Sequence, residues 1–143
     1  MDSNYIINTI LKSAGLDIST GGSAKAKTVN NVLYKIADVI YTALTAGNVP
    51  VLTGIDIDDG FSKIVLVQVD NTGTMSVKAS SAFANVTNEV AVLANAPTLD
   101  EGMAFVGLIV ISNASGSVFT GNTTALDAGG ITTTYIDAPV IGA

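Results

Sequence analysis

The stretch FSKIVLVQVDNTGTMSVKA, from Phe61 to Ala79, decides the fold. Its first half alternates between two apolar sets: Val65, Val67 and Val69 on one face, and Ile64 and Leu66 on the other. Alternation with a period of two residues is typical of a β-strand. Because both faces are apolar, we expect this strand to be covered on both sides.

A turn and a second strand complete this stretch. Residues 70–73, DNTG, favour a tight turn, because Asp and Asn side chains bond their own backbone and glycine adopts a positive φ without a clash. After the turn, Met75, Val77 and Ala79 alternate with polar residues. The sequence therefore predicts a β-hairpin with a buried first strand and a half-exposed second strand.

Further short strands are expected after residue 28. Ala104 to Ser112 is a strongly apolar run in which Gly107 indicates a bulge or a close backbone approach, and residues 131–137 (ITTTYID) alternate well. Shorter strands are expected at 50–57 and 89–94, and Leu126 is expected to fill the core from a loop. About eight short strands at even spacing predict a mainly β domain over residues 28–143, an antiparallel sandwich or barrel.

Residues 28–46 fit two interpretations. The apolar residues that fit one face of a helix are Val32, Ile36, Val39, Ile40, Ala43 and Leu44. The same segment is rich in β-branched residues, with Tyr34 and Tyr41 among them, and so also fits two strands joined at Ala37 and Asp38. The pattern alone does not choose between a helix and a hairpin.

Residues 1–27 are expected to form an N-terminal helical arm followed by a flexible linker. Residues 4–14 carry apolar side chains at helical spacing, and Gly15 stands where a C-terminal glycine would end the helix. A helix this short needs a surface to lie on, either its own domain or a partner. Residues 16–27 are small, polar and Gly-rich, which is typical of a linker. The candidate partner-binding residues are Ile6, Ile7, Ile10 and Leu11.

The composition argues against several functions. The 143 residues include no Cys, His, Trp or Arg, and the net charge is −6, so we expect no nucleic-acid partner. No apolar run approaches the roughly 20 residues of a membrane helix, so we expect no membrane partner either. Yet mean hydropathy is +0.52 and only 13% of residues are charged. This apolar surplus predicts burial between subunits, because obligate interfaces resemble a divided core.

Three acidic or Gly-rich stretches have residue types that could serve as chemical sites. Asp56, Asp58 and Asp59 with Gly60 resemble a calcium loop, but the glycine comes one place early and the twelfth position carries valine. A carboxylate pair from Asp100-Glu101 and Asp127 has no base or electrophile beside it in the sequence, and residues 19–23 lack the phosphate-loop pattern. We therefore assign no catalytic, metal or cofactor residue and expect no enzyme.

Taken together, three stretches of the chain resemble a known family. They are KTVNNVLYKIADVIYT (27–42), KIVLVQVDNTGTMSV (63–77) and GLIVISNASGSVFTGNTTALDAGGITTTYID (107–137). They resemble small structural proteins of tailed phages, described as head decoration (cement) or head-fibre proteins. The most distinctive part is Phe119 followed by G-N-T-T-x-L-D-A-x-G and a Thr-rich strand. In that family the first stretch is a hairpin with Asn-Gly or Asp-Gly at its tip, which favours the hairpin here, although Ala37-Asp38 lacks the glycine.

The resemblance implies a virion protein on the outer surface of an icosahedral head. Its partners would be the major capsid protein and two copies of itself in a homotrimer, and it would stabilise the capsid by contacts that span neighbouring capsomers. The alternative within the same family is a head-fibre or tail-appendage adhesin that binds a host surface glycan. A small hydrolase is a more remote third hypothesis, since the chain has no His for a catalytic triad.

Overall fold

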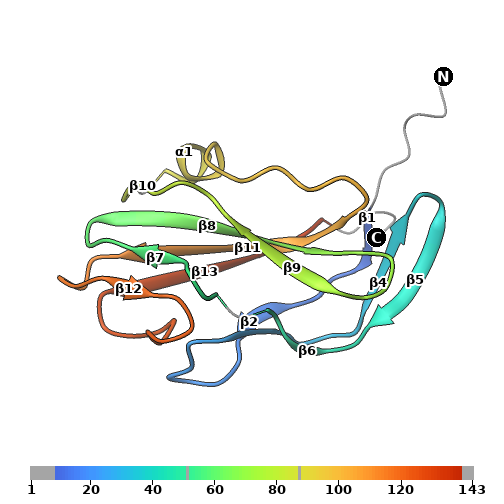
Figure 1. Cartoon of the computed structure of the whole chain (residues 1–143), viewed down its shortest axis with the longest axis horizontal. Coiled ribbons are helices and arrows are strands. Elements are labelled where there is room, and N and C mark those ends of the chain that lie inside the picture. The colour runs from blue at the N-terminus through green and yellow to red at the C-terminus, as the bar shows by residue number, and fades with distance from the viewer. Residues whose placement is uncertain (1–8, 51, 87, 140–143) are drawn as a thin grey trace.

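The computed structural model describes residues 9–50, 52–86 and 88–139, and its fold is mainly β, as predicted (Figure 1). The main sheet has five antiparallel strands in the order β10-β8-β11-β13, with β9 also pairing with β8. These strands are β8 (Phe61–Val69), β9 (Met75–Ala79), β10 (Phe83–Ala84), β11 (Ala104–Asn113) and β13 (Ile131–Asp137). The predicted central hairpin is confirmed as β8 and β9, and β11 lies between β8 and β13.

Smaller sheets form the opposite layer. One has the order β1-β4-β5, a second β2-β3-β6 and a third β12-β7. Their strands are β1 (Thr9–Lys12), β2 (Leu16–Ile18), β3 (Ala26–Thr28), β4 (Val32–Ile36), β5 (Val39–Leu44), β6 (Gly47–Asn48), β7 (Asp56–Ile57) and β12 (Phe119–Thr120). The arrangement is an antiparallel sandwich, with β2 and β6 on one side of the main sheet in Figure 1.

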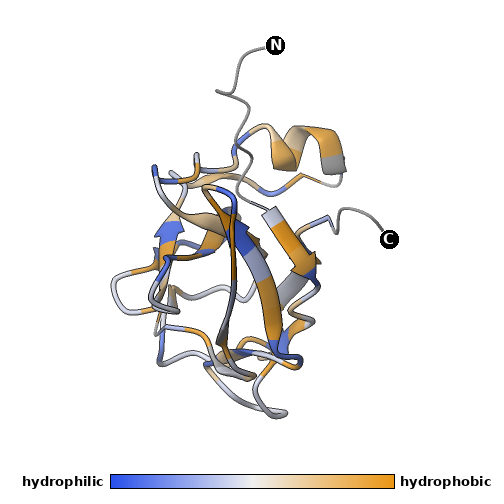
Figure 2. Ribbon diagram, turned by 90° about the vertical axis from the view of Figure 1, so that its right-hand side faces the viewer, coloured by the Kyte–Doolittle hydropathy of each residue, from blue (hydrophilic) through white to orange (hydrophobic). Residues whose placement is uncertain are grey.

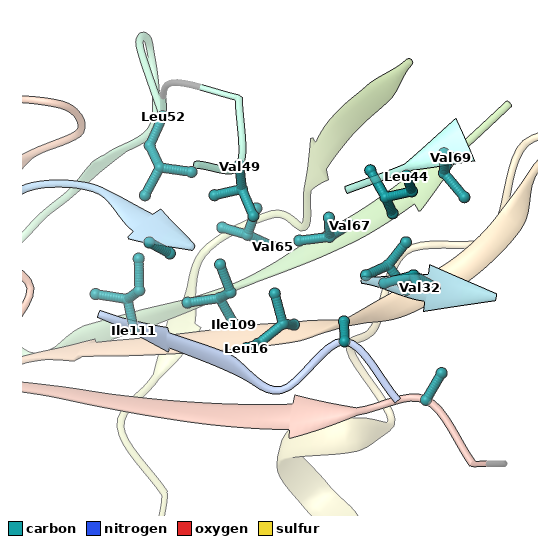
Figure 3. Packing of buried hydrophobic residues seen from close by; sticks show 14 of the residues in the cluster. Leu16, Val32, Leu44, Val49, Leu52, Val65, Val67, Val69, Ile109 and Ile111 are labelled. Atoms are coloured by element: carbon teal, nitrogen blue, oxygen red, sulfur yellow. The ribbon is translucent and has the colours of Figure 1, made fainter. Parts of the chain in front are cut away.

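The main core fills the space between these layers. Figure 3 shows Val65, Val67 and Val69 of β8 directed toward side chains of the opposite layer. The other members include Leu16, Val32, Leu44, Val49, Leu52, Ile109, Ile111, Phe119 and Leu126. Leu126 is 1% exposed, so the predicted core plug from a loop is confirmed.

The other face of the main sheet is covered by α1 (Glu89–Leu93) and the segments around it (Figures 1 and 2). A second buried cluster lies there, with Ile64 and Leu66 from β8 and Leu108 and Val110 from β11. Strand β8 is therefore covered on both sides, as its two apolar sets predict.

The predicted N-terminal helix is wrong for the residues that the structure describes in this segment. Thr9–Lys12 is strand β1, in which Ile10 lies opposite Tyr34 of β4. The remaining predicted residues, 1–8, lie outside the described part. The flexible linker is also wrong for 16–18 and 26–28, which pair as β2 and β3. Ile10 and Leu16 belong to the main core, so this segment is held by tertiary contacts that a local pattern does not record.

Two further strand predictions need correction. Residues 89–94 were expected to be a strand, but Glu89–Leu93 is helical. The side-chain oxygen of Asn88 accepts hydrogen bonds from the backbone N–H groups of Val90 and Ala91, at 2.9 and 3.3 Å. This N-cap satisfies helix donors and outweighs the strand preference of the valines. In the predicted strand 50–57, only Asp56–Ile57 is a strand among the described residues.

The ambiguous segment 28–46 forms a hairpin of β4 and β5. Its two-residue turn is Ala37-Asp38, with φ of 50° and 68°. Two positive φ values are the geometry of a type I′ turn, whose twist matches that of the flanking strands. Alanine is a strained choice at such a position, because a Cβ disfavours the left-handed region.

Candidate functional site

The predicted partner-binding residues do not form one surface in the described part of the chain. Ile10 is 1% exposed and packs in the protein's own core, whereas Leu11 beside it is partly exposed. Ile6 and Ile7 lie outside the described residues. Ile10 thus follows the alternative in which the N-terminal stripe packs on its own domain.

One aspartate of the calcium-like stretch makes a structural side-chain contact, and another lies in a strand pair. Asp56 lies opposite Thr120 in the β7–β12 pair, and the Oδ1 atom of Asp59 accepts a hydrogen bond from the Gly116 N–H at 2.9 Å. Within the described ranges, no group of three or more His, Cys, Asp or Glu side chains is placed to hold a metal ion.

Asp100 anchors the loop before β11 to the central hairpin. Its carboxylate accepts hydrogen bonds from Lys78 Nζ at 2.8 Å and from Gln68 Nε2 at 2.7 Å, while Gln68 Oε1 accepts from the Asp100 N–H at 3.0 Å. The hydrogen bonds from Lys78 and Gln68 lower the pKa of Asp100. The carboxylate is therefore a charged structural anchor rather than a proton donor.

Asp127, the other member of the carboxylate pair considered above, holds a different segment. Its two carboxylate oxygens accept from the Gly22 N–H at 3.1 and 2.9 Å, which ties the loop before β13 to the turn between β2 and β3. Asp100 and Asp127 thus stabilise separate loops, and neither is joined to the other by a hydrogen bond.

The tip of the β4–β5 hairpin is a first candidate surface. Val39 and Ile40 follow its turn and are 50% and 59% exposed. Further from the turn, where Tyr34 lies opposite Tyr41, their rings stack with centroids 5.5 Å apart. The Tyr34 hydroxyl donates a hydrogen bond to the Asp70 carbonyl at 2.8 Å. The apolar tip therefore stands on a hairpin that is fixed to the central turn (Figure 1).

The second candidate surface is the free edge of β13 (Ile131–Asp137) with a hollow on either side of the strand. One hollow, of about 320 Å³, is lined by Ile18, Leu126, Asp127, Ile131, Thr132, Thr133 and Tyr135. The other, of about 390 Å³, lies beside α1 and is lined by Val86, Val92, Leu93, Val110, Ser112, Thr132, Thr134 and Ile136. No described strand pairs with β13 on the side away from β11.

Tyr135 gives the first hollow its unusual chemistry. The Tyr135 hydroxyl oxygen is shut off from solvent and has no hydrogen-bond partner among the described residues. Burial raises the pKa of Tyr135 to about 12, and the negative charges of Asp17 and Asp127 add to the shift. The phenol therefore stays neutral at neutral pH, and the carboxylates of Asp17 and Asp127 give the surroundings of Tyr135 a negative potential.

Neither surface could be recognised by a motif. The residues around the first hollow come from β2, the 121–130 loop and β13, so only the tertiary fold brings them together. The alternation of residues 131–137 predicts the strand, but its position at the sheet edge depends on the strand order.

Comparisons of this chain with protein-family models, curated proteins and solved structures find no match. In the described part of the chain, no helix has the length and apolar character needed to cross a membrane.

Proposed function

We propose that this protein is a structural component of a phage virion, a decoration protein that binds the outer surface of the icosahedral head as a homotrimer and stabilises it. The sequence resemblance suggests this family, and the sandwich fold is compatible with it. The major capsid protein is the proposed partner. No chemical step is required, because a protein that binds the assembled shell more tightly than its free subunits stabilises the shell by mass action.

The observation that carries the proposal is the apolar tip of the β4–β5 hairpin. Val39 and Ile40 are consecutive residues of β5 next to the turn, and both side chains are exposed, one on each face of the hairpin. They follow a turn that places Ala37 in the left-handed region at φ 50°. Exposed apolar side chains on a strained but well-anchored turn favour an interaction role over a solvent-facing loop.

The tip suits contact between copies of the chain. The whole chain carries a net charge of −6, so long-range repulsion opposes self-association. A contact through Val39 and Ile40 avoids placing carboxylates against each other at its centre, although Asp38 stands at its margin with Lys35 as its ion-pair partner at 3.4 Å. Three such contacts would close a trimer and add multivalency to the attachment on the shell.

The function is tested on particles that lack the protein. Purified heads are incubated with the protein, washed, and analysed for bound copies and for the temperature at which they release DNA. We expect saturable binding and a higher release temperature than for bare heads. No binding to heads, or an unchanged release temperature at saturation, would reject the decoration role.

A further inference from the structure

Strand β13 is a sheet edge with which no described strand pairs on the side away from β11, although the Leu16 N–H of β2 donates to the side chain of its last residue at 2.8 Å. It has seven residues, and only the last, Asp137, is charged. Edge strands of soluble proteins are usually protected from pairing by charged residues, proline or bulges. Residues 131–136 contain none of these, and their Ile, Thr and Tyr side chains favour extended structure.

The register shows which backbone groups of β13 are free. The Ala114 N–H donates to the Gly130 carbonyl at 2.8 Å, and the Ala138 N–H donates to the Val106 carbonyl at 3.1 Å. In an antiparallel ladder, every second residue points its N–H and C=O toward the same neighbour. Even-numbered residues of β13 therefore bond β11, and the backbone groups of Thr133 and Tyr135 point outward, where no described group accepts from their N–H.

The two hollows match the alternation of β13. Ile131, Thr133 and Tyr135 line the hollow on one side, and Thr134 and Ile136 line the hollow on the other, beside α1, while Thr132 borders both. An added strand has the same period of two residues. Its side chains would therefore enter the two hollows in turn, one set on each side of the sheet.

The two hollows differ in charge. The hollow beside α1 is lined by apolar side chains, Ser and Thr. The other combines the apolar walls of Ile18 and Leu126 with the carboxylate of Asp127, and the charge of Asp17 reaches Tyr135 there. Lys27 lies opposite Asp17 in the β2–β3 register, yet the two ion pairs among the described residues are Lys35–Asp38 and Lys78–Asp100. A long alkyl stem with a cationic end fits this hollow.

We propose that the free edge of β13 binds an extended segment of a partner polypeptide, which adds as a further strand, places a lysine side chain in the hollow at Asp127 and places apolar side chains in the hollow beside α1. Outward-pointing backbone groups supply the affinity, and the two hollows supply the side-chain preference. The proposal does not depend on the virion role.

The probe is a capped pentapeptide, Thr-Val-Lys-Val-Thr, titrated into the isotopically labelled protein and followed by amide chemical shifts. We expect saturable shifts at residues 131–136, with a Kd about tenfold lower than that of the matched peptide with Glu in place of Lys. A third peptide, methylated on its backbone nitrogens, lacks the donors for strand pairing and should not bind.

Variants on the protein side test the lysine hollow. Asp127→Asn keeps an oxygen for the Gly22 N–H and removes the charge, so the Kd for the lysine peptide should rise about threefold while that for the Glu peptide falls. The control Asp38→Asn changes a charge on the β4–β5 turn and should change neither Kd.

Four results would overturn the proposal. They are equal affinity of the lysine and Glu peptides, binding of the methylated peptide, shifts confined to other strands, and shifts at residues 131–136 that appear when the protein alone is concentrated. The last result would mean that a second copy of the chain covers this edge.

Discussion

Tyr135 illustrates, at the scale of one residue, that a buried polar group need not stabilise the fold. Its hydroxyl has no partner among the described residues, and an unsatisfied buried hydroxyl costs about 1–3 kcal/mol. We expect Tyr135→Phe to leave the protein as stable at pH 7 as the wild type, or more stable by up to that amount. Urea unfolding measures the difference, and a clear loss of stability would show that the hydroxyl has a partner.

The same residue makes stability fall in alkali. A free tyrosine ionises near pH 10, whereas in the folded protein the pKa of Tyr135 is raised to about 12. The unfolded chain therefore loses the Tyr135 proton at a lower pH than the folded protein. The contribution of this raised pKa to the free energy of unfolding is fully present below about pH 10 and is lost as the pH rises toward 12. Tyrosinate absorbance should show a late-ionising phenol that Tyr135→Phe removes, and unfolding measured against pH should lose part of its alkaline decline in the variant.

Asn113 is a buried side chain whose hydrogen bonds are all satisfied. Its Nδ2 donates to the carbonyls of Ile57 at 2.8 Å and Ser117 at 2.7 Å, and its Oδ1 accepts from the Ser115 N–H at 3.0 Å. Asn113→Asp keeps the shape but turns a carboxylate oxygen toward two carbonyls. We expect a loss of about 3 kcal/mol at neutral pH, partly recovered in acid when the carboxyl group is protonated. Thermal unfolding at two pH values tests this, and a loss independent of pH would contradict it.

At the scale of elements, long strands could be predicted from the sequence and short ones could not. β8 alternates between two apolar sets with a period of two residues, and β11 is a continuous apolar run of β-branched and other apolar residues bounded by turn residues. The sequence predicts a helix where β1 forms, because the spacing of four apolar residues also fits a helix and the pairing of β1 with β4 is a tertiary contact. These residues are Ile6, Ile7, Ile10 and Leu11. The sequence predicts a strand at 89–94 because valines favour strands locally, whereas the N-cap at Asn88 favours the helix that forms.

For the two candidate surfaces too, part could be predicted from the sequence and part depends on the tertiary fold. The β4–β5 hairpin was left open by the pattern and favoured by the family resemblance, and its tip residues Val39 and Ile40 were visible as apolar positions. Their exposure, like the free edge of β13, is a property of the assembled sheets. A sequence pattern gives the period of a strand, but the identity of its neighbours comes from packing.

Gly121 follows β12 and lies against the backbone of the 52–55 segment, which leaves no room for a side chain. A Cβ added there would lie 1.8 Å from the Leu52 carbonyl oxygen, so the backbones must separate to admit any side chain. We expect Gly121→Ala to destabilise the protein by about 3 kcal/mol, the upper end for overpacking, because backbone atoms cannot rotate away. Gly129→Ala is the matched control, since a Cβ at Gly129 meets nothing within 4 Å. Similar unfolding midpoints for the two variants would contradict the expectation.

At the scale of the whole molecule, the question is what covers the apolar surface that the sandwich leaves exposed. The core residues are buried, yet Val39 and Ile40 remain about half exposed at the hairpin tip. If the tip joins copies of the chain, replacing both residues with Thr removes apolar contact area while keeping β-branched side chains suited to a strand. The fold should therefore be retained and the oligomer weakened.

Sedimentation velocity tests this directly. We expect the wild type to sediment with a mass near three times 14.5 kDa and the Val39→Thr/Ile40→Thr variant to shift toward the mass of the monomer. The free energy of unfolding of the monomer should change by less than about 0.5 kcal/mol. Val118→Thr is the matched control, because Val118 is 53% exposed and lies outside the hairpin. Equal dissociation of the control and the hairpin variant would mean that general hydrophobicity drives assembly. A wild type that stays monomeric would remove the hairpin contact altogether, and the trimer with it.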